Sequence, residues 1–168
     1  MQKISHRTIP ELIGIVLKRR KDKYENIFTD PFHGELLGAL ESAIREQGYY
    51  MMIYISEDIE EIVRNIVGWN TEGLILIGML HDDYLKIRSK YKKPAVLIDS
   101  YTPKNIARYV NIGLDDEEGG YLMTKYLLNC GHRKIAFLAD NMEGVDYIRY
   151  TGHQRHFRNT DWILIWII

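Results

Sequence analysis

Two polar side chains have the chemistry needed to bind a small polar molecule. Arg149 lies in the stretch Tyr-Ile-Arg-Tyr-Thr-Gly-His, and its planar guanidinium can donate to two oxygens at once, from hydroxyl groups or a carboxylate. Asp99 follows an apolar run, so its carboxylate points out of the carboxyl end of the expected strand rather than into the core. Simpler interpretations remain: an exposed arginine at a helix start, and an aspartate in a turn, since Ser100 and Pro103 follow.

The motifs that would indicate catalysis or nucleotide binding do not occur in the sequence. Neither GxGxxG, GxxxxGK[ST] nor GxSxG is found, and without a glycine-rich turn the backbone amides cannot close around a phosphate. Cys130 falls on the expected inner side of a helix, where it would pack as a small hydrophobic residue. Of the six histidines, only His153 and His156 have helical spacing, and no carboxylate or thiol nearby completes a metal site. We therefore expect no enzyme activity, metal or cofactor, and a binding role.

Composition limits the class of protein further. The chain has 168 residues, a formal net charge of −1 and a single cysteine, which fits one α/β domain and gives no basic excess for binding nucleic acid or a membrane surface. The basic run at residues 18–23 is interpreted as a solvated loop. The N-terminus lacks a secretory signal pattern, and no apolar run is long enough to span a bilayer. A cytoplasmic protein is the expectation.

The elements that would position Arg149 and Asp99 alternate between strand and helix patterns. Short β-branched runs separated by amphipathic helices are typical of a parallel sheet with helices on both faces. The expected strands are residues 11–17, 49–55, 72–78, 94–100, 109–114 and 134–140, and the helical patterns are residues 31–48, 56–69, 81–91 and 115–131.

Start and stop signals support the helices. Pro31 begins the first and Gly48 ends it, Ser56 or Asp58 caps the second, and Asp115 begins the last, which stops at Gly131. In that last helix a set of side chains is expected to face the core: Leu122, Met123, Tyr126, Leu127 and Cys130.

In order and spacing these segments resemble a known family. "IGIVL", "DPFHGELLGALESAIREQGYYMMIY", "EGLILIG", "KPAVLIDSY", "VNIGLDDEEGGYLMTKYLLNCGHRKIAFLAD" and "IRYTGH" are similar to the effector-binding region of lac repressor-type transcription regulators, itself similar to periplasmic sugar-binding proteins. The resemblance covers about residues 12–154 and is sharpest over 111–138. It implies a doubly wound, Rossmann-like α/β fold of the type I periplasmic-binding-protein kind.

The resemblance also implies a domain organisation. Regulators of this type carry a DNA-binding headpiece and two similar subdomains that clamp the effector. Residues 1–11 are too few for a helix-turn-helix, so we expect a residual N-terminal segment at 1–11, the N-terminal effector-binding subdomain at 12–154, and a tail outside the family at 155–168. The chain is then expected to be truncated, with DNA bound only through a headpiece that it lacks.

The site residues implied by the resemblance cluster at the carboxyl edge of the sheet. Phe32 would stack against the effector, although a hydrophobic staple for the helix is equally open. Asp99 would accept hydrogen bonds from effector hydroxyls, and Arg149 belongs to an Arg-x-x-Gly-aromatic pattern in which His153 replaces the aromatic residue. The full candidate set is Asp30, Phe32, Asp99, Asp146, Tyr147 and Arg149, with Asp146 and Tyr147 the weakest. Asp115 and Asp116 are expected to cap the following helix, with some contribution to the cleft wall.

The expected function is sensing of a small molecule, most simply a sugar, by one subdomain of a transcription regulator that forms a homodimer when intact and contacts no membrane. Alternatives are an interaction fragment that pairs with full-length subunits, a periplasmic-binding-like solute-binding protein, and a small flavodoxin-like or sugar-phosphate enzyme.

The tail "DWILIWII" (161–168) departs from the family pattern, which would continue an amphipathic helix. It could add a strand to a sheet edge, or it could be out-of-frame sequence that is exposed and prone to aggregate, because it has high β propensity and no charge after Asp161. The second interpretation is favoured.

Overall fold

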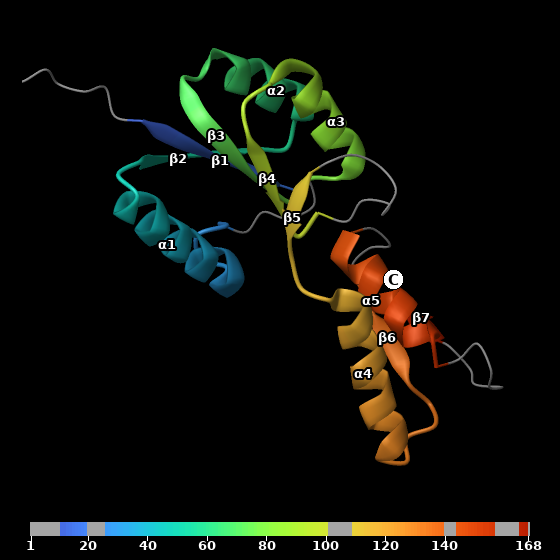
Figure 1. Ribbon diagram of the computed structural model, residues 1–168. Helices are drawn as coiled ribbons and strands as arrows, with labels where there is room; N and C mark the ends of the chain where they lie inside the picture. The colour runs from blue at the N-terminus through green and yellow to red at the C-terminus, as the bar shows by residue number, and fades with distance from the viewer. Residues whose placement is uncertain (1–10, 20–25, 101–108, 140–143, 157–164, 168) are drawn as a thin grey trace, which may run out of the picture. The chain divides into compact units, whose positions relative to one another are not determined.

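The computed structural model describes residues 11–19, 26–100, 109–139, 144–156 and 165–167 (Figure 1). The chain divides into two compact units. The first comprises Met1–Ile98 and Arg108–Val110, and the second comprises Asp99–Ala107 and Asn111–Ile168. The bounds expected from the sequence, a subdomain at 12–154 with flanking segments at 1–11 and 155–168, describe a different division of the chain. They stay a prediction.

Unit 1 is built on a parallel sheet. β1 (Leu12–Lys18) pairs in parallel with β2 (Tyr50–Ser56) on one side and β3 (Thr71–Ile77) on the other, and β3 pairs in parallel with β4 (Ala95–Ile98). The sheet order is β2-β1-β3-β4-β5, with β5 (Val110–Ile112) at the boundary between the units. The expected strands are confirmed, with ends that shift by a few residues.

Helices cover both faces of this sheet, as expected for a doubly wound fold (Figure 1). α2 (Ile59–Gly68) and α3 (His81–Lys90) pack on one face, where Val16 and Leu76 are buried with them. α1 (Pro31–Glu46) packs on the other face with Ile15, Leu17 and Ile77. Successive residues of a strand point to opposite faces, so the uninterrupted apolar runs of β1 and β3 supply both cores.

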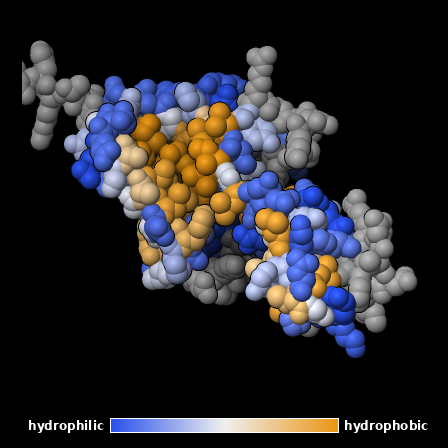
Figure 2. All heavy atoms as spheres, turned by 60° about the horizontal axis from the view of Figure 1, so that its bottom comes forward, coloured by the Kyte–Doolittle hydropathy of each residue, from blue (hydrophilic) through white to orange (hydrophobic). Residues whose placement is uncertain are grey.

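Several apolar side chains next to α1 are only partly buried. This group includes Ile13, Leu36, Leu40, Met51, Ile53, Ile55 and Ile75, and Figure 2 shows a broad apolar area on unit 1. Among the described helices of unit 1, α1 is the one that contributes buried residues to this core. One helix is about 10 Å wide, roughly two strands, which explains the incomplete cover.

The helix starts follow the sequence signals. Asp30 caps α1 by accepting from the backbone N–H of His33 at 2.9 Å, and Asp58 rather than Ser56 caps α2 by accepting from that of Glu60. The basic run beginning at Lys18 is not all solvated. Lys18 Nζ lies 2.6 Å from Oδ2 of Asp83 in α3, and the side chain of Asp83 is 8% exposed. Residues 20–25 of that run lie outside the described residues.

Unit 2 contains two helices and a two-stranded sheet. α4 (Asp116–Asn129) is followed by β6 (Ala136–Leu138), α5 (Gly144–Gln154) and β7 (Ile165–Ile167). Asp115 caps α4 as expected, accepting from the N–H of Glu118 at 3.1 Å. At the other end Gly131 takes a positive φ of 90°, the left-handed conformation that commonly ends a helix.

Three residues of the apolar tail form β7, which pairs in parallel with β6. This pairing agrees with the added-strand interpretation, the less favoured of the two. The interpretation of the tail as out-of-frame sequence stays a prediction. The neighbouring tail residues 157–164 and 168 lie outside the described residues. No helix in the described part of the chain is long and apolar enough to cross a membrane.

The expected inner face of α4 is only partly confirmed. Leu127 is half-buried and faces the space between α4, β6 and α5. Leu122, Met123 and Tyr126 are 52–66% exposed, and Cys130 is also exposed. The buried residues of α4 are instead Asp116 and Thr124, eight positions apart and thus on one side of the helix. Apolar periodicity missed this side because it consists of small and polar residues.

Candidate functional site

α4 and α5 cross at two glycines. A Cβ atom at Gly120 would lie 2.1 Å from the backbone oxygen of Arg149, and one at Gly152 would lie 1.8 Å from that of Glu117. No side chain fits at either distance, so both positions require glycine. The glycines let the two backbones touch, and this contact fixes which residues of α5 face α4.

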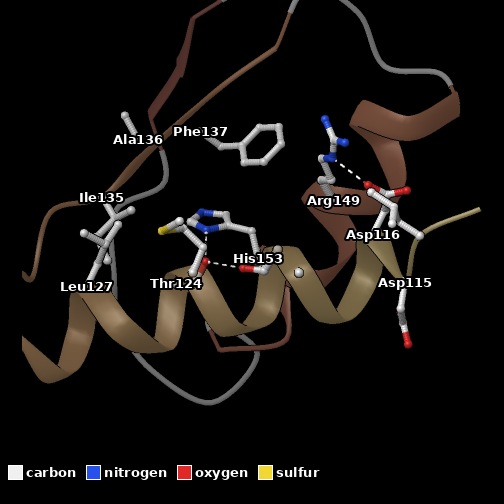
Figure 3. Close-up of a pocket in the computed structure, with 13 residues that line it drawn as sticks. Asp115, Asp116, Thr124, Leu127, Ile135, Ala136, Phe137, Arg149 and His153 are labelled. Atoms are coloured by element: carbon white, nitrogen blue, oxygen red, sulfur yellow. Dashed lines mark hydrogen bonds and ion pairs between the residues drawn. The ribbon is translucent and has the colours of Figure 1, made fainter. Parts of the chain in front are cut away.

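The crossing leaves a pocket of about 440 Å³ between α4, β6 and α5. Its walls are mostly apolar, and its lining residues are Leu114, Asp115, Asp116, Gly119, Gly120, Met123, Thr124, Leu127, Ile135, Ala136, Phe137, Arg149 and His153. In Figure 3, Arg149 and Asp116 lie at one end, Leu127 and Ile135 at the other, and the Phe137 ring lies across the middle. The pocket thus has a charged end and an apolar end.

Arg149 and Asp116 form the charged end. Arg149 Nε donates to Asp116 Oδ1 at 2.7 Å, and the Asp116 side chain is 5% exposed whereas that of Arg149 is 47% exposed. Arg149 is therefore held through Nε while the outer part of its guanidinium remains accessible. This arrangement presents a fork of donors beside a buried carboxylate, which suits a ligand that carries oxygens.

His153 and Thr124 form the middle of the pocket wall. His153 is 2% exposed, its Nδ1 lies 2.7 Å from Thr124 Oγ1, and that hydroxyl also donates to the carbonyl of Gly120 at 2.8 Å. Because the hydroxyl has one hydrogen, Nδ1 donates to Oγ1 when the hydroxyl donates to the carbonyl. Burial lowers the pKa of His153, and His156 lowers it further, so His153 is neutral at pH 7.

The remaining charges near the pocket are acidic or already paired. Asp115 lies on the rim, and Glu117 and Glu118 follow in the first turn of α4. Arg155 lies 3.0 Å from Glu118 and 3.8 Å from Glu117. Acidic residues at this end of a helix are stabilised by the helix dipole. Within the described residues, no group of three His, Cys, Asp or Glu is placed to hold a metal ion.

Of the six candidate residues, Arg149 is the one that lines this pocket. Asp30 and Phe32 belong to unit 1. Asp30 caps α1, and the backbone and side chain of His33 lower the pKa of its carboxyl group. Phe32 is 51% exposed and its ring meets that of His33 edge-on at 5.4 Å. Neither placement tests a ligand role, which stays a prediction for both.

Asp99 has an unusual backbone. Its φ of 48° is the one positive value among the described non-glycine residues, and aspartate is among the few residue types that adopt it. Its N–H donates to the carbonyl of Ile112 at 2.9 Å, and its Oδ1 would lie 2.9 Å from a Cβ at Gly113. Such strain is common at functional sites, but Asp99 does not line the pocket.

Asp146 and Tyr147 lie in the first turn of α5, before Arg149, and do not line the pocket. The residue that the sequence interpretation undervalued is Asp116. The sequence predicts that Asp115 and Asp116 cap α4 and contribute to the cleft wall. Asp115 supplies the cap, both residues line the pocket, and Asp116 reaches across to α5. Two adjacent aspartates at a helix start were the available signal, because one of them suffices for capping.

Comparison with known proteins gives consistent results. No protein-family model matches the sequence. The arabinose metabolism transcriptional repressor of Geobacillus stearothermophilus is 28% identical over 151 residues, covering 76% of this chain and 38% of the repressor. A transcriptional regulator CelR–cellobiose complex has a TM-score of 0.73 at 20% identity, covering 88% of this chain and 47% of the other. A lac repressor dimer bound to operator and an anti-inducer has a TM-score of 0.75 at 19% identity, covering 95% and 47%.

The chain resembles lac repressor-type regulators in both sequence and fold. The resemblance expected from the sequence is therefore confirmed, as is the periplasmic-binding-protein-like fold. The chain spans about two fifths of the length of the curated relatives it matches. What those proteins bind as wholes does not carry over to this chain without further argument.

Proposed function

We propose that this chain is the effector-sensing part of a lac repressor-type transcription regulator, and that Arg149 contacts the effector at the pocket of unit 2. The observation that carries the proposal is the placement of Arg149. The residue that the sequence pattern singled out lines a pocket, is held by a buried carboxylate, and keeps the outer part of its guanidinium accessible.

The pocket supports a sugar or a related small molecule as effector. Its charged end can exchange hydrogen bonds with hydroxyl groups, and Phe137 offers an aromatic ring to the apolar side of such a ligand. In an intact regulator the effector would shift the population between DNA-competent and incompetent states through its differential affinity for them. DNA binding itself would belong to another part of such a regulator.

The test is a titration of the isotopically labelled chain, followed by NMR, with a panel of neutral sugars and nucleobases. We expect millimolar binding by one of them, because a single subdomain offers half of a clamp, and shifted amides at the start of α4 and along α5. Arg149→Gln should abolish the shifts. Arg149→Lys, which retains a charge to pair with Asp116 but lacks the fork, should weaken binding about tenfold or more.

Arg45→Gln provides the matched control, since Arg45 is an exposed arginine of α1 that pairs with Glu41. It should leave the titration unchanged. Shifts that map elsewhere, or that survive in both Arg149 variants, would refute the site. Micromolar affinity would refute the half-clamp interpretation.

A second candidate function is pairing with another subunit. The observation that favours it is a pair of exposed apolar side chains on α4, Leu122 at 52% and Tyr126 at 66% exposure, because exposed apolar patches often mark interaction sites. Native mass spectrometry of the chain mixed with an intact homologue would show mixed dimers if this function is correct. No exchange at high micromolar concentration would exclude it.

A further inference from the structure

An arginine that faces a pocket without a partner favours anions, because its fork matches the two oxygens of a carboxylate or phosphate. Arg149 has a partner. Asp116 accepts from its Nε at 2.7 Å and is 5% exposed, so water screens the carboxylate charge only weakly. The charge of Arg149 is therefore largely compensated by Asp116.

Asp116 is not needed to start the helix. Asp115 caps α4 through the N–H of Glu118, and the carboxylate of Asp116 is directed across to α5 instead (Figure 3). A buried carboxylate costs free energy unless it is paired. Asp116 also lines the pocket, so its charge lies in the wall that a ligand would meet.

The surroundings add to the effect. Among the described residues, Asp115, Asp116 and Arg149 are the charged ones that line the pocket. The Asp115 carboxylate caps α4 and points away from the other two in Figure 3, so Asp116 is the carboxylate beside Arg149. The nearby Arg155 is occupied by Glu117 and Glu118, and the buried His153 is neutral. An anionic ligand would thus meet the Asp116 carboxylate in the pocket wall beside Arg149, whereas hydroxyl groups can both donate to a carboxylate and accept from a guanidinium.

We propose that Asp116 sets the ligand class: it restricts the pocket to neutral, hydroxyl-rich ligands and excludes sugar acids and sugar phosphates. This inference rests on the effector role of Arg149 proposed above. It assigns to Asp116 a specificity-determining role that is separate from the stability of α4.

The experiment compares D-glucose with D-glucuronate, which differ only in a carboxylate at C6, by NMR titration of the whole chain. The unaltered chain should bind glucuronate about tenfold or more weakly than glucose. Asp116→Asn keeps an oxygen that can accept from Nε but removes the charge. In this variant the affinity for glucuronate, expressed as a ratio to the affinity of the same protein for glucose, should rise about tenfold.

Asp115→Asn is the matched control, because it removes the same charge one residue away and asparagine caps helices equally well. It should raise the affinity for glucuronate much less than Asp116→Asn does. A second measurement needs no variant: at pH 6.5 the cationic sugar D-glucosamine should bind the unaltered chain at least as tightly as glucose.

The inference is overturned if glucuronate binds the unaltered chain as tightly as glucose, if glucosamine is rejected, or if both asparagine variants change the selectivity equally. Binding of neutral sugars at Arg149 would in each case leave the proposed function intact. If no sugar shifts the pocket residues of any of the three proteins, the proposed function fails and the inference fails with it.

Discussion

The contact between α4 and α5 predicts that two adjacent glycines respond oppositely to the same substitution. A Cβ at Gly120 would lie 2.1 Å from the oxygen of Arg149, whereas one at Gly119 meets nothing within 4 Å. Alanine in a helix interior is favoured over glycine by about 0.5–1 kcal/mol. Gly119→Ala should therefore stabilise unit 2 by about that amount.

Gly120→Ala gains the same stability from helix propensity but loses more through steric overlap with α5. Real Cβ contacts are essentially never shorter than 3.0 Å, so the helices must separate by at least 0.9 Å, the difference between 3.0 and 2.1 Å. The obstructing atom is backbone and cannot rotate away. Overpacking costs about 1–3 kcal/mol, and we take ~3 kcal/mol here because backbone meets backbone, which leaves a net loss of about 2 kcal/mol.

The two variants should therefore differ by about 3 kcal/mol in the free energy of unfolding. Urea denaturation followed by far-UV circular dichroism measures this difference, and hydrogen exchange of the α5 amides shows whether the loss is local to the α4–α5 contact. Equal stability of the two variants, or a loss confined to unit 1, would show that the close helix crossing does not exist.

Two further predictions concern buried ionisable groups. The pKa of His153 is lowered by burial, so below about pH 6.5 the unfolded chain binds a proton that the folded chain does not. The free energy of unfolding should therefore be independent of this group above that pH and decrease as the pH falls below it. Urea denaturation across pH 5–8 measures this dependence. His153→Phe should flatten this dependence, the exposed His132→Asn should not, and an unchanged slope in His153→Phe would contradict the assignment. Lys18→Met leaves Asp83, whose side chain is 8% exposed, without its cation, and it should lower the free energy of unfolding by about 3 kcal/mol. Lys86→Met is the control, because Lys86 and Glu60 form an exposed pair, and it should lower that free energy by about 0–1 kcal/mol. Equal losses of the two variants in thermal or urea unfolding would show that the Lys18 pair is not buried.

The site could be predicted from the sequence only in part. Arg149 was identifiable because its chemistry and its Arg-x-x-Gly pattern are local. Asp116 was not, because its partner lies 33 residues away and the same residue has a sufficient local explanation as a helix cap. The pocket of unit 2 does not include Asp99, Phe32 or the other candidates, and their ligand roles stay predictions.

The sequence by itself determined the elements and their order. Strands with apolar residues on both faces, aspartate caps at Asp30, Asp58 and Asp115, and the glycine at Gly131 each depend on interactions within a few residues. The parallel α/β fold follows from that alternation, because short strands joined by helices can pair in few other ways.

Only the tertiary structure decided which side of α4 is buried and what the pocket contains. The helix crossing depends on the absence of side chains at Gly120 and Gly152. Hydrophobic periodicity does not predict such a contact, because glycine has no apolar side chain that would contribute to the pattern. That crossing brings Asp116 to Arg149 and Thr124 to His153. These pairings are long-range, so they are set by the angle and distance between two helices rather than by the preference of either residue.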